Sequence, residues 1–253
     1  MFPIHEANIH AVELTDPVFV SDIHIANAPQ AASFIDFLHT EAAAHAELVV
    51  LGDLFDAWPG DEKLDEYPEL VSALRAFSSE RPLYVMHGNR DFFLGKAFKT
   101  RTGANLLADP CVATVQGLTL LVSHGDAWCT KDLAYQKARR WTKGFLGQLL
   151  LTVLPYAARV KIAGAAKTRS AQNKRTLQAS AFEVVDADVA LPAGRPVDAV
   201  VHGHTHRPGR SIMPSGIPRY TLPDWRFSDR GLASWGWLSV ASGELQLQLR
   251  NRP

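Results

Sequence analysis

Five short apolar runs recur along most of the chain, and each ends directly in a group of polar residues. The runs are Val18–Val20, Leu48–Leu51, Leu83–Met86, Leu118–Val122 and Val197–Val201. Unbroken apolar runs that are rich in β-branched residues are typical of strands buried on both faces. Helical periodicity lies between the first runs, over Ala31–Ala46 and Tyr67–Ser79. This alternation predicts an α/β fold with the polar groups at the carboxyl ends of strands, where open α/β sheets bind ligands.

The C-terminal part of the chain has a different pattern. Turn signals of Asp, Gly and Ser separate three runs, which predict an antiparallel meander over Arg219–Leu222, Gly236–Val240 and Leu245–Leu249. Before the fifth apolar run, residues 132–189 interrupt the strand pattern with a stretch that is rich in Leu, Ala and basic residues and has helical periodicity. We therefore expect a single domain over residues 1–253, with residues 132–189 forming an inserted helical cap.

Composition adds one feature to this picture. The 253 residues suffice for one large domain, and 47% apolar with 21% charged residues is ordinary for a globular protein. The formal net charge is zero, but the segment Leu133–Phe182 holds ten Lys or Arg and no acidic residue, leaving 16 basic against 26 acidic residues elsewhere. A basic block of this size indicates an anionic partner or surface.

The chain carries no sequence signal for secretion or membrane insertion. Two cysteines, Cys111 and Cys129, provide no disulfide framework and fit a reducing compartment. The N-terminus lacks a basic segment followed by an apolar one, so no signal peptide is predicted. The longest uncharged apolar stretch, Gly144–Ala158, contains Pro155 and is shorter than the roughly 20 residues of a membrane span. We expect a cytoplasmic protein.

The five polar groups contain side chains that bind divalent metals. They read Asp22-Ile-His24, Gly52-Asp53-Leu-Phe-Asp56, Gly88-Asn89-Arg90-Asp91, His124-Gly125-Asp126 and Gly203-His204-Thr-His206. Carboxylates and imidazoles without thiolates favour a catalytic over a structural metal site. Together the groups supply enough oxygen and nitrogen ligands for two adjacent metals, which predicts a metal-dependent phosphoester or phosphoanhydride hydrolase.

Some of these side chains have individual roles that follow from their positions. Asp22 and His24 lie two residues apart, so we expect them to leave the same face of an extended segment and to reach one metal. Asp53 follows Gly52, which permits a sharp turn at a crowded site, and its carboxylate is placed to bridge two metals. Arg90 is suited to neutralise phosphoryl oxygens.

Other acidic and histidine side chains near the five groups are expected to support the ligands. Asp56, Asp91 and Asp126 are typical of residues that orient ligands through hydrogen bonds or stabilise loops. His87 and His202 directly precede their groups, and we expect them to pack against or support the ligands.

At these five groups the chain resembles the calcineurin-like metallophosphoesterase superfamily, whose pattern is D-x-H, G-D-x-x-D, G-N-H-[DE], H and G-H-x-H. Most members have a histidine where this chain has Arg90. With this arginine, the chain resembles the branch of the superfamily that hydrolyses UDP-2,3-diacylglucosamine in lipid A biosynthesis. Three longer motifs carry the same resemblance: Gly-Asp-Leu-Phe-Asp-Ala-Trp, His-Gly-Asp-x-x-Cys-Thr-x-Asp and His-Gly-His-Thr-His-Arg-Pro. The similarity runs from about Val18 to Leu238.

The resemblance implies two packed mixed sheets flanked by helices, with a helical cap over the metals. It implies hydrolysis of UDP-2,3-diacylglucosamine to 2,3-diacylglucosamine 1-phosphate and UMP, by a water that two metals, usually Mn²⁺, activate for attack on the α-phosphorus. It also implies peripheral association with the inner membrane of a Gram-negative bacterium, on the cytoplasmic side. No nucleic-acid partner is expected.

The resemblance also assigns residues by motif. The ligands implied for the first metal are Asp22, His24, Asp53 and His206. Those implied for the second are Asp53, Asn89, His124 and His204, with Asp53 bridging. The positions that match substrate contacts are Asn89, Arg90, Asp132 and His204. The residues expected to carry catalysis are Asp53, Asn89, Arg90 and His124. His124 and His204 are expected to act as ligands and not as general bases, because a metal-bound imidazole cannot also accept protons.

The second cap helix departs from the family pattern at positions that the resemblance implies contact substrate. Family members have a small polar residue, a polar residue and a lysine along the second cap helix, where ungapped alignment places Asn173, Leu177 and Ser180. The lysine is missing, and only Asn173 is chemically suited to bind substrate. A shifted helix offers Ser170 or Lys174 instead.

The apolar segment Gly144–Leu154, flanked by basic residues such as Arg139 and Lys161, is suited to receive two acyl chains and to touch an anionic bilayer surface. An ordinary core-facing helix pair with solvated basic ends is the alternative. Two other functions also stay open. A phosphoesterase acting on a soluble nucleotide, phosphodiester or phosphoprotein would need neither Arg90 nor an apolar, basic cap. A non-catalytic scaffold of this fold usually lacks several ligands, whereas this chain has them all.

Overall fold

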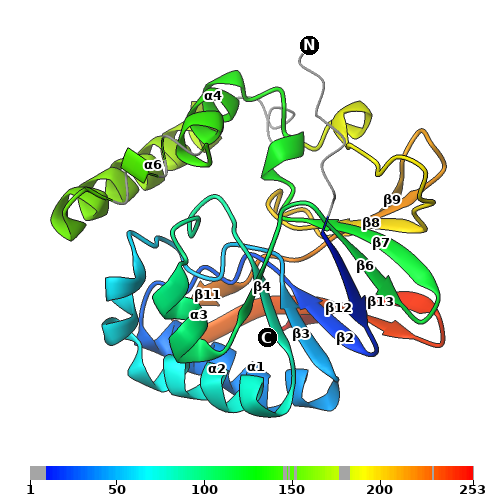
Figure 1. Ribbon diagram of the computed structural model, residues 1–253, viewed down its shortest axis with the longest axis horizontal. Coiled ribbons are helices and arrows are strands. Elements are labelled where there is room, and N and C mark those ends of the chain that lie inside the picture. Colours follow the sequence, from blue (N-terminus) through cyan, green and yellow to red (C-terminus); the bar gives the residue numbers. More distant parts are fainter. Residues whose placement is uncertain are drawn as a thin grey trace.

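The computed structural model describes residues 10–144, 147, 149–150, 153–176, 183–229 and 231–252, and gives only the backbone of residues 169–176. Two mixed β-sheets pack against each other, with helices outside them (Figure 1). One sheet has six strands in the order β1 (Ala11–Leu14), β6 (Cys111–Val115), β7 (Leu118–Ser123), β8 (Ala199–His202), β10 (Pro218–Thr221) and β9 (Gly209–Ile212). The other has the order β11 (Arg226–Ser228), β12 (Gly231–Ala241), β2 (Pro17–Val20), β3 (Glu47–Val50), β4 (Leu83–Met86) and β5 (Asn105–Leu107), with β13 (Glu244–Asn251) paired to β12. The architecture confirms the predicted fold class.

The central strands are buried on both faces because successive side chains enter different cores. On β2, Val18 and Val20 pack under the helices, while Phe19 packs between the two sheets. The helices α1 (Ala28–His39), α2 (Pro68–Glu80) and α3 (Lys96–Thr102) lie on one side of the sheets (Figure 1). Burial on both faces explains why these strands read as unbroken apolar runs and do not alternate. Because β2, β3, β4 and β5 run parallel, their carboxyl ends meet at one edge.

The first helix differs from its prediction at both ends. It begins at Ala28 because the Asn27 side chain accepts a hydrogen bond from Gln30 N at 3.0 Å, a typical N-cap. It ends at His39, and the predicted extension to residue 46 is wrong. Thr40 leaves the helical region, with φ −111° and ψ −89°, and its hydroxyl bonds back to the Asp36 carbonyl at 2.7 Å. A separate 3₁₀ turn then leads the chain into β3.

The predicted C-terminal meander is partly wrong. The strands β12 and β13 form the expected antiparallel pair. The run Arg219–Leu222, however, belongs to the other sheet, where β10 pairs in parallel with β8 and antiparallel with β9. Tyr220 and Leu222 are buried between the two sheets, so burial keeps this run in the first sheet. The Pro223-Asp224 signal that follows marks a crossing between sheets and not a hairpin turn.

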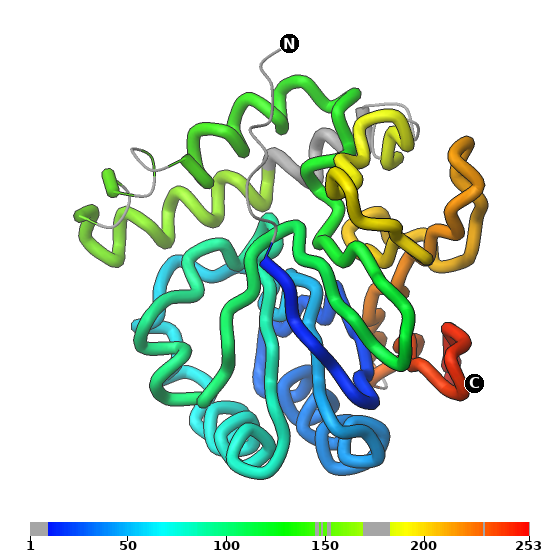
Figure 2. Tube along the Cα trace, turned by 45° about the vertical axis from the view of Figure 1, so that its right-hand side comes forward, coloured from blue at the N-terminus to red at the C-terminus, as the bar shows by residue number. Residues whose placement is uncertain are grey.

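The remaining long helices lie away from α1, α2 and α3. Both views place α4 (Leu133–Thr142) and α6 (Tyr156–Thr176) beside the end of the sheets where the polar loops lie (Figure 1, Figure 2). Between them, Leu149, Leu150 and Val153 expose 54%, 53% and 70% of their surface. In the described ranges, no helix combines the length and apolar character that a bilayer crossing requires.

Candidate metal centre

Both sheets contribute side chains to one site at their carboxyl edge. From the sheet of β2, β3 and β4 come Asp22, His24, Asp53 and Asn89, and from the sheet of β7 and β8 come His124, His204 and His206. The structure thus brings together all seven side chains predicted as metal ligands. Five of them form two overlapping sets that share Asp22, one with His24 and His206 and the other with Asp53 and His124, and in each set the ligand atoms lie within 4.8 Å of one another.

The backbone at the site is not extended, contrary to the expectation for Asp22 and His24. Their φ angles are 54° and 56°, and Asp53, His204 and His206 are also left-handed. These five are most of the seven non-glycine residues with positive φ in the part of the chain that the structure describes. Left-handed backbone costs about 1–2 kcal/mol for a residue with a side chain. The loops are therefore shaped for the convergence of their side chains, at a cost that the surrounding structure sustains.

Glycine is required where the loops approach one another, as the sequence predicted for Gly52. Its φ is +86°, and a Cβ on it would lie 2.6 Å from His124 Nδ1. A Cβ on Gly88 would lie 2.1 Å from Asp53 Oδ1. Neither position leaves room for any other residue.

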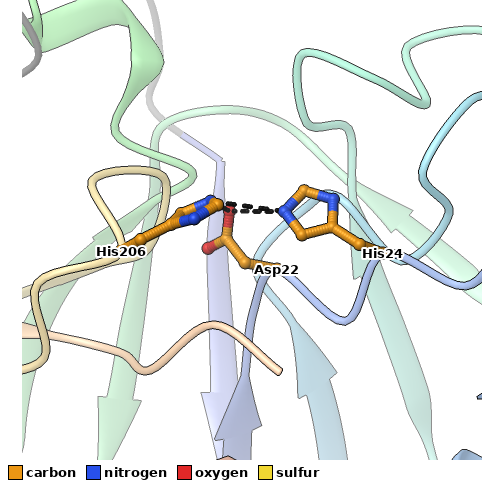
Figure 3. A group of neighbouring side chains, drawn as sticks. All are labelled: Asp22, His24 and His206. Atoms are coloured by element: carbon orange, nitrogen blue, oxygen red, sulfur yellow. Dashed lines mark hydrogen bonds and ion pairs between the residues drawn. The ribbon is translucent and has the colours of Figure 1, made fainter. Parts of the chain in front are cut away.

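The first group of ligands consists of Asp22, His24 and His206 (Figure 3). His206 Nε2 lies 3.3 Å from Asp22 Oδ1 and 3.3 Å from His24 Nε2. The other oxygen, Asp22 Oδ2, accepts hydrogen bonds from His204 N at 2.7 Å and Ser21 Oγ at 2.6 Å. Asp22 Oδ1 is buried and has no hydrogen-bond partner among the described residues. One carboxylate oxygen is thus left facing two imidazole nitrogens, a set that suits a divalent cation.

A carboxylate that the sequence analysis missed orients His206. Asp224 Oδ2 lies 3.3 Å from His206 Nδ1. Because a carboxylate can only accept a hydrogen bond, His206 Nδ1 carries the proton and the lone pair of Nε2 faces Asp22. A histidine whose second nitrogen donates to a carboxylate is typical of metal sites. Burial raises the pKa of Asp224, but His206 and Arg226 outweigh it and leave the pKa below its ordinary value. The signal in the sequence was weak, an acid two residues after an apolar run.

The second group is built around Asn89. Its Oδ1 lies 3.0 Å from His124 Nε2 and 2.9 Å from His204 Nδ1. His124 Nδ1 lies 2.9 Å from the carbonyl oxygen of Leu51, which can only accept, so Nδ1 carries the proton. Nε2 of His124 is therefore the ring nitrogen that faces the amide oxygen of Asn89. A bound cation would take both atoms as ligands.

Asp53 lies between the two groups. Its Oδ1 accepts a hydrogen bond from Arg90 N at 2.8 Å. Its Oδ2 lies 3.8 Å from His124 Nε2 and 3.9 Å from His24 Nδ1, whereas His24 faces His206 through Nε2. Asp53 therefore lies beside both groups, and its predicted role as a bridging ligand stays a prediction.

The protonation of the site also fits metal binding. Burial and the neighbouring Asp22 raise the pKa of Asp53, and burial with Asp53 raises the pKa of Asp91 to about 6. Burial lowers the pKa values of His24 and His204 to about 3. His24 and His204 are therefore neutral near pH 7. Burial lowers the pKa of His124, but Asp53 and Asp22 outweigh burial and raise it, and burial raises the pKa of Asp22, but His206 and His124 outweigh burial and lower it. Bound divalent cations would supply positive charge beside Asp53, whose charged form the fold disfavours.

Two acids, Asp91 and Asp56, support the loops of the site as predicted. Asp91 is buried and accepts hydrogen bonds from the backbone N–H groups of residues 53, 54, 55 and 88, which stabilises both loops. Asp56 accepts a hydrogen bond from Arg90 Nη1 at 2.8 Å and pairs with Lys167 of α6.

His87 and His202 each form a hydrogen bond of 2.8 Å to a carbonyl oxygen of their own loop.

Asp126 attaches α4 to the loop that carries His124. Its carboxylate is fully buried and pairs with Arg139 at 2.8 Å and Lys143 at 3.3 Å. It also accepts a hydrogen bond from the Tyr135 hydroxyl, and the Tyr135 ring stacks on His204, with 6.1 Å between ring centres. Tyr135 was not identified from the sequence, where it is one of several aromatic residues on an apparently ordinary helix.

The side chains predicted to contact substrate are only partly described. Arg90 and Asp132 line a cavity of about 220 Å³ above the ligands, and the Asp132 carboxylate caps α4 by accepting from Tyr135 N at 2.9 Å. The side chain of Asn173 lies outside the described residues, as do Leu177 and Ser180. Lys167, which the sequence analysis did not single out, lines the same cavity.

Comparison with known proteins places these features in a family. The model for calcineurin-like phosphoesterases matches residues 17–208. The chain is 41% identical to a UDP-2,3-diacylglucosamine hydrolase of Ralstonia nicotianae, over 92% of each chain. It is 38% identical to the protein of that name from Chromobacterium violaceum, over 82% of this chain and 89% of the relative. A solved dimetal phosphatase from Danio rerio is 12% identical, with a TM-score of 0.46 over 94% of this chain and 96% of that one.

Proposed function

The chain belongs to the calcineurin-like phosphoesterase family and is a metal-dependent hydrolase, and from this premise we propose that it hydrolyses UDP-2,3-diacylglucosamine. Water adds to the α-phosphorus, the bridging P–O bond breaks, and the products are UMP and 2,3-diacylglucosamine 1-phosphate. Relatives named UDP-2,3-diacylglucosamine hydrolase match the chain over most of its length.

The observation that carries the proposal is the composition of the 220 Å³ cavity. One part of its lining consists of ligand side chains, among them Asp53, Asn89 and His204. Another part is apolar and includes Trp58 and Ile162. A substrate that joins a pyrophosphate to an acylated sugar has these two characters side by side. A soluble nucleotide would leave the apolar part without a partner.

The chemistry supplied by two bound divalent cations is the activation of a water molecule and the neutralisation of phosphoryl charge. The residues that would hold them are Asp22, His24, Asp53 and His206 for one, and Asp53, Asn89, His124 and His204 for the other. We propose Mn²⁺ for both, since it is the usual metal of the family that the chain resembles and carboxylate and carbonyl oxygens are ligands that suit it.

Arg90 neutralises phosphoryl oxygens beside these ligands. Its guanidinium is aimed by the 2.8 Å hydrogen bond from Nη1 to Asp56 Oδ1 and lies with Nε 3.9 Å from Asp53 Oδ2. A planar, always protonated group in a partly buried position binds phosphate with more directional contacts than a lysine. The leaving group is a sugar phosphate, whose low basicity removes the need for a proton donor. Consistent with this, His24 and His204 are neutral near pH 7.

We further propose that residues 132–189 act as a cap that holds the acyl chains and rests on the cytoplasmic face of the inner membrane. The exposed side chains of Leu149, Leu150 and Val153 lie between the two cap helices, on a segment flanked by basic residues. Exposed apolar side chains with basic neighbours favour the surface of an anionic bilayer.

The test of the proposed function is Mn²⁺-dependent release of UMP from UDP-2,3-diacylglucosamine in detergent micelles. The unacylated UDP-sugar and a generic phosphodiester serve as comparisons. Strong preference for the diacylated substrate supports the proposal and the role of the cap. Equal turnover of all three would instead identify a phosphoesterase of broad specificity, in which the cap is ordinary packing.

A further inference from the structure

A second cavity of about 340 Å³ lies next to the first and has no role in the mechanism above. Its lining includes His87, Leu107 and Asp109, together with Phe92, Arg139 and Lys143. The last three also line the first cavity, so the two cavities are neighbours across them.

Asp109 gives this cavity an unused hydrogen-bond acceptor. Its side chain is only 9% exposed. Oδ1 accepts hydrogen bonds from Ser123 Oγ at 2.6 Å and His124 N at 3.2 Å. Oδ2 is buried and has no hydrogen-bond partner within the described ranges. A buried carboxylate oxygen without a donor is costly, which indicates that a ligand or water supplies the donor.

Two cationic donors flank this acceptor. Lys143 Nζ lies 3.7 Å and Arg139 Nη2 3.8 Å from Asp109 Oδ2, beyond hydrogen-bond distance. Both cations are also paired with Asp126, so two positive groups face two negative ones. Because these charges balance, the cavity does not attract a further phosphate. A neutral ligand that brings one donor between two acceptors matches the arrangement.

We propose that this cavity binds the uracil ring of the substrate, an inference that rests on the proposed function. The edge of uracil presents the acceptors O4 and O2 on either side of the donor N3–H. Asp109 Oδ2 accepts from N3–H, and Arg139 and Lys143 donate to the two carbonyl oxygens. Cytosine presents an acceptor at N3 and a donor at N4, and is rejected because the acceptor at Asp109 meets a lone pair. The Phe92 ring offers an apolar surface for the base.

The position of the cavity relative to the ligands supports this assignment. His87 lines the second cavity, and Asn89, two residues on, lines the first among the ligand side chains. Two residues span at most about 7 Å. The distance from the base of a nucleotide to its 5′-phosphate is of the same order. The uracil and the α-phosphate therefore occupy adjoining cavities, and the acylated sugar extends along the apolar part of the first.

The test is the binding of UMP, CMP and 3-methyl-UMP, which lacks the N3 proton, to the Mn²⁺-loaded protein, measured by calorimetry beside inorganic phosphate. We expect UMP to bind about tenfold or more tightly than either analogue, in line with loss of one hydrogen bond to a charged group. Asp109→Asn should abolish the preference for UMP over CMP while leaving phosphate binding within about twofold. Asp65→Asn, on an exposed acid paired with Arg101, should preserve the preference.

Equal binding of UMP and 3-methyl-UMP to the unaltered protein would overturn the inference, and this comparison requires no variant to fold. An unchanged ratio of UMP to CMP affinities in Asp109→Asn would overturn it too. The proposed function is tested separately by turnover. Turnover of UDP-2,3-diacylglucosamine without a base preference in binding would refute only the uracil site, whereas selective binding of UMP without turnover of this substrate would refute only the proposed function.

Discussion

His124 Nδ1 donates a hydrogen bond to the carbonyl oxygen of Leu51 across a distance of 2.9 Å. The histidine follows β7 of one sheet and the leucine follows β3 of the other, so this bond joins the two sheets at the site. It also sets the ring nitrogen that faces Asn89. The geometry of the metal centre is therefore tied to the packing of the sheets.

Gly52 packs against the histidine that makes this hydrogen bond. Gly52→Ala places a Cβ 2.6 Å from His124 Nδ1 on a backbone with φ +86°. We expect it to lower the free energy of unfolding by about 3 kcal/mol, from clash and left-handed strain together. Thermal unfolding and metal content measure the effect. Gly216→Ala is the matched control, because its φ is +85° with nothing within 4 Å of the added Cβ; an equal loss there would leave strain alone as the cause.

Removing the bridging carboxylate should separate activity from stability. Asp53→Ala should lower kcat by at least about 1,000-fold, since both bound cations lose a shared ligand. The metal-free protein should not be destabilised, because burial and Asp22 already disfavour the charged form of Asp53. Chemical denaturation with and without Mn²⁺ measures both parts. Retained turnover would contradict the bridging role, and Asp65→Ala controls for loss of an acid.

Asp224 should control metal affinity without binding metal itself. Asp224→Ala should weaken Mn²⁺ binding about 10–100-fold, because His206 loses the partner that orients its ring. Asp224 also pairs with Arg226, whose side chain is 62% exposed. Arg226→Ala removes that exposed pair and keeps the contact with His206, so it should leave Mn²⁺ affinity unchanged. If both variants bind Mn²⁺ as tightly as the native protein, the orienting role is wrong.

Asp126 should make the attachment of α4 depend on pH. Burial raises its pKa, but Lys143 and Arg139 outweigh burial and hold the pKa well below the ordinary value. A depressed pKa in the folded state contributes stability above the unfolded pKa, about 4, and this contribution is lost as the pH falls through the folded value. Asp126→Asn should therefore lower the free energy of unfolding by about 3 kcal/mol at pH 7. The difference from the native protein should shrink below about pH 4 in denaturation curves; a constant difference would exclude the charge as its cause.

The exposed apolar side chains of the cap should act on the acylated substrate alone. Replacing Leu149 and Leu150 by Gln and Val153 by Thr should raise KM for the diacylated substrate about tenfold, because exposed apolar area no longer meets acyl chains or bilayer. The value of kcat and the turnover of an unacylated analogue should change little. Binding to vesicles of anionic lipid should weaken in parallel. Equal losses on both substrates would point to misfolding of the cap.

The central strands could be predicted from sequence because burial on both faces leaves a continuous apolar run, as in β2 and β3. The strands β1, β5, β9 and β11 were not predicted, since short segments with mixed exposure carry no comparable pattern. The strand β6 was not predicted either, although four of its five residues are buried, because Thr114 interrupts its apolar run. The ligands were identified because they follow strands directly. Their left-handed backbone was not, because Asp and His tolerate that conformation without being required by it.

Contacts between segments that are distant along the chain could not be predicted from the sequence. Asp224 reaches His206 only because the chain crosses between sheets after β10, where the sequence indicated a meander. The pairing of Lys167 with Asp56 depends on how α6 lies across the loops. Neither relationship leaves a periodic signal, since each joins one residue to one partner far along the chain.

The division of the ligands between two sheets has a consequence for the cell. A cation held from both sides stabilises only the state in which the sheets are packed, so the folded fraction rises with the ratio of free metal to its dissociation constant. When metal is scarce, more chains open and become substrates for proteases. The amount of folded hydrolase should thus follow the supply of metal, and metal starvation would lower activity through the abundance of the enzyme as well as through its turnover.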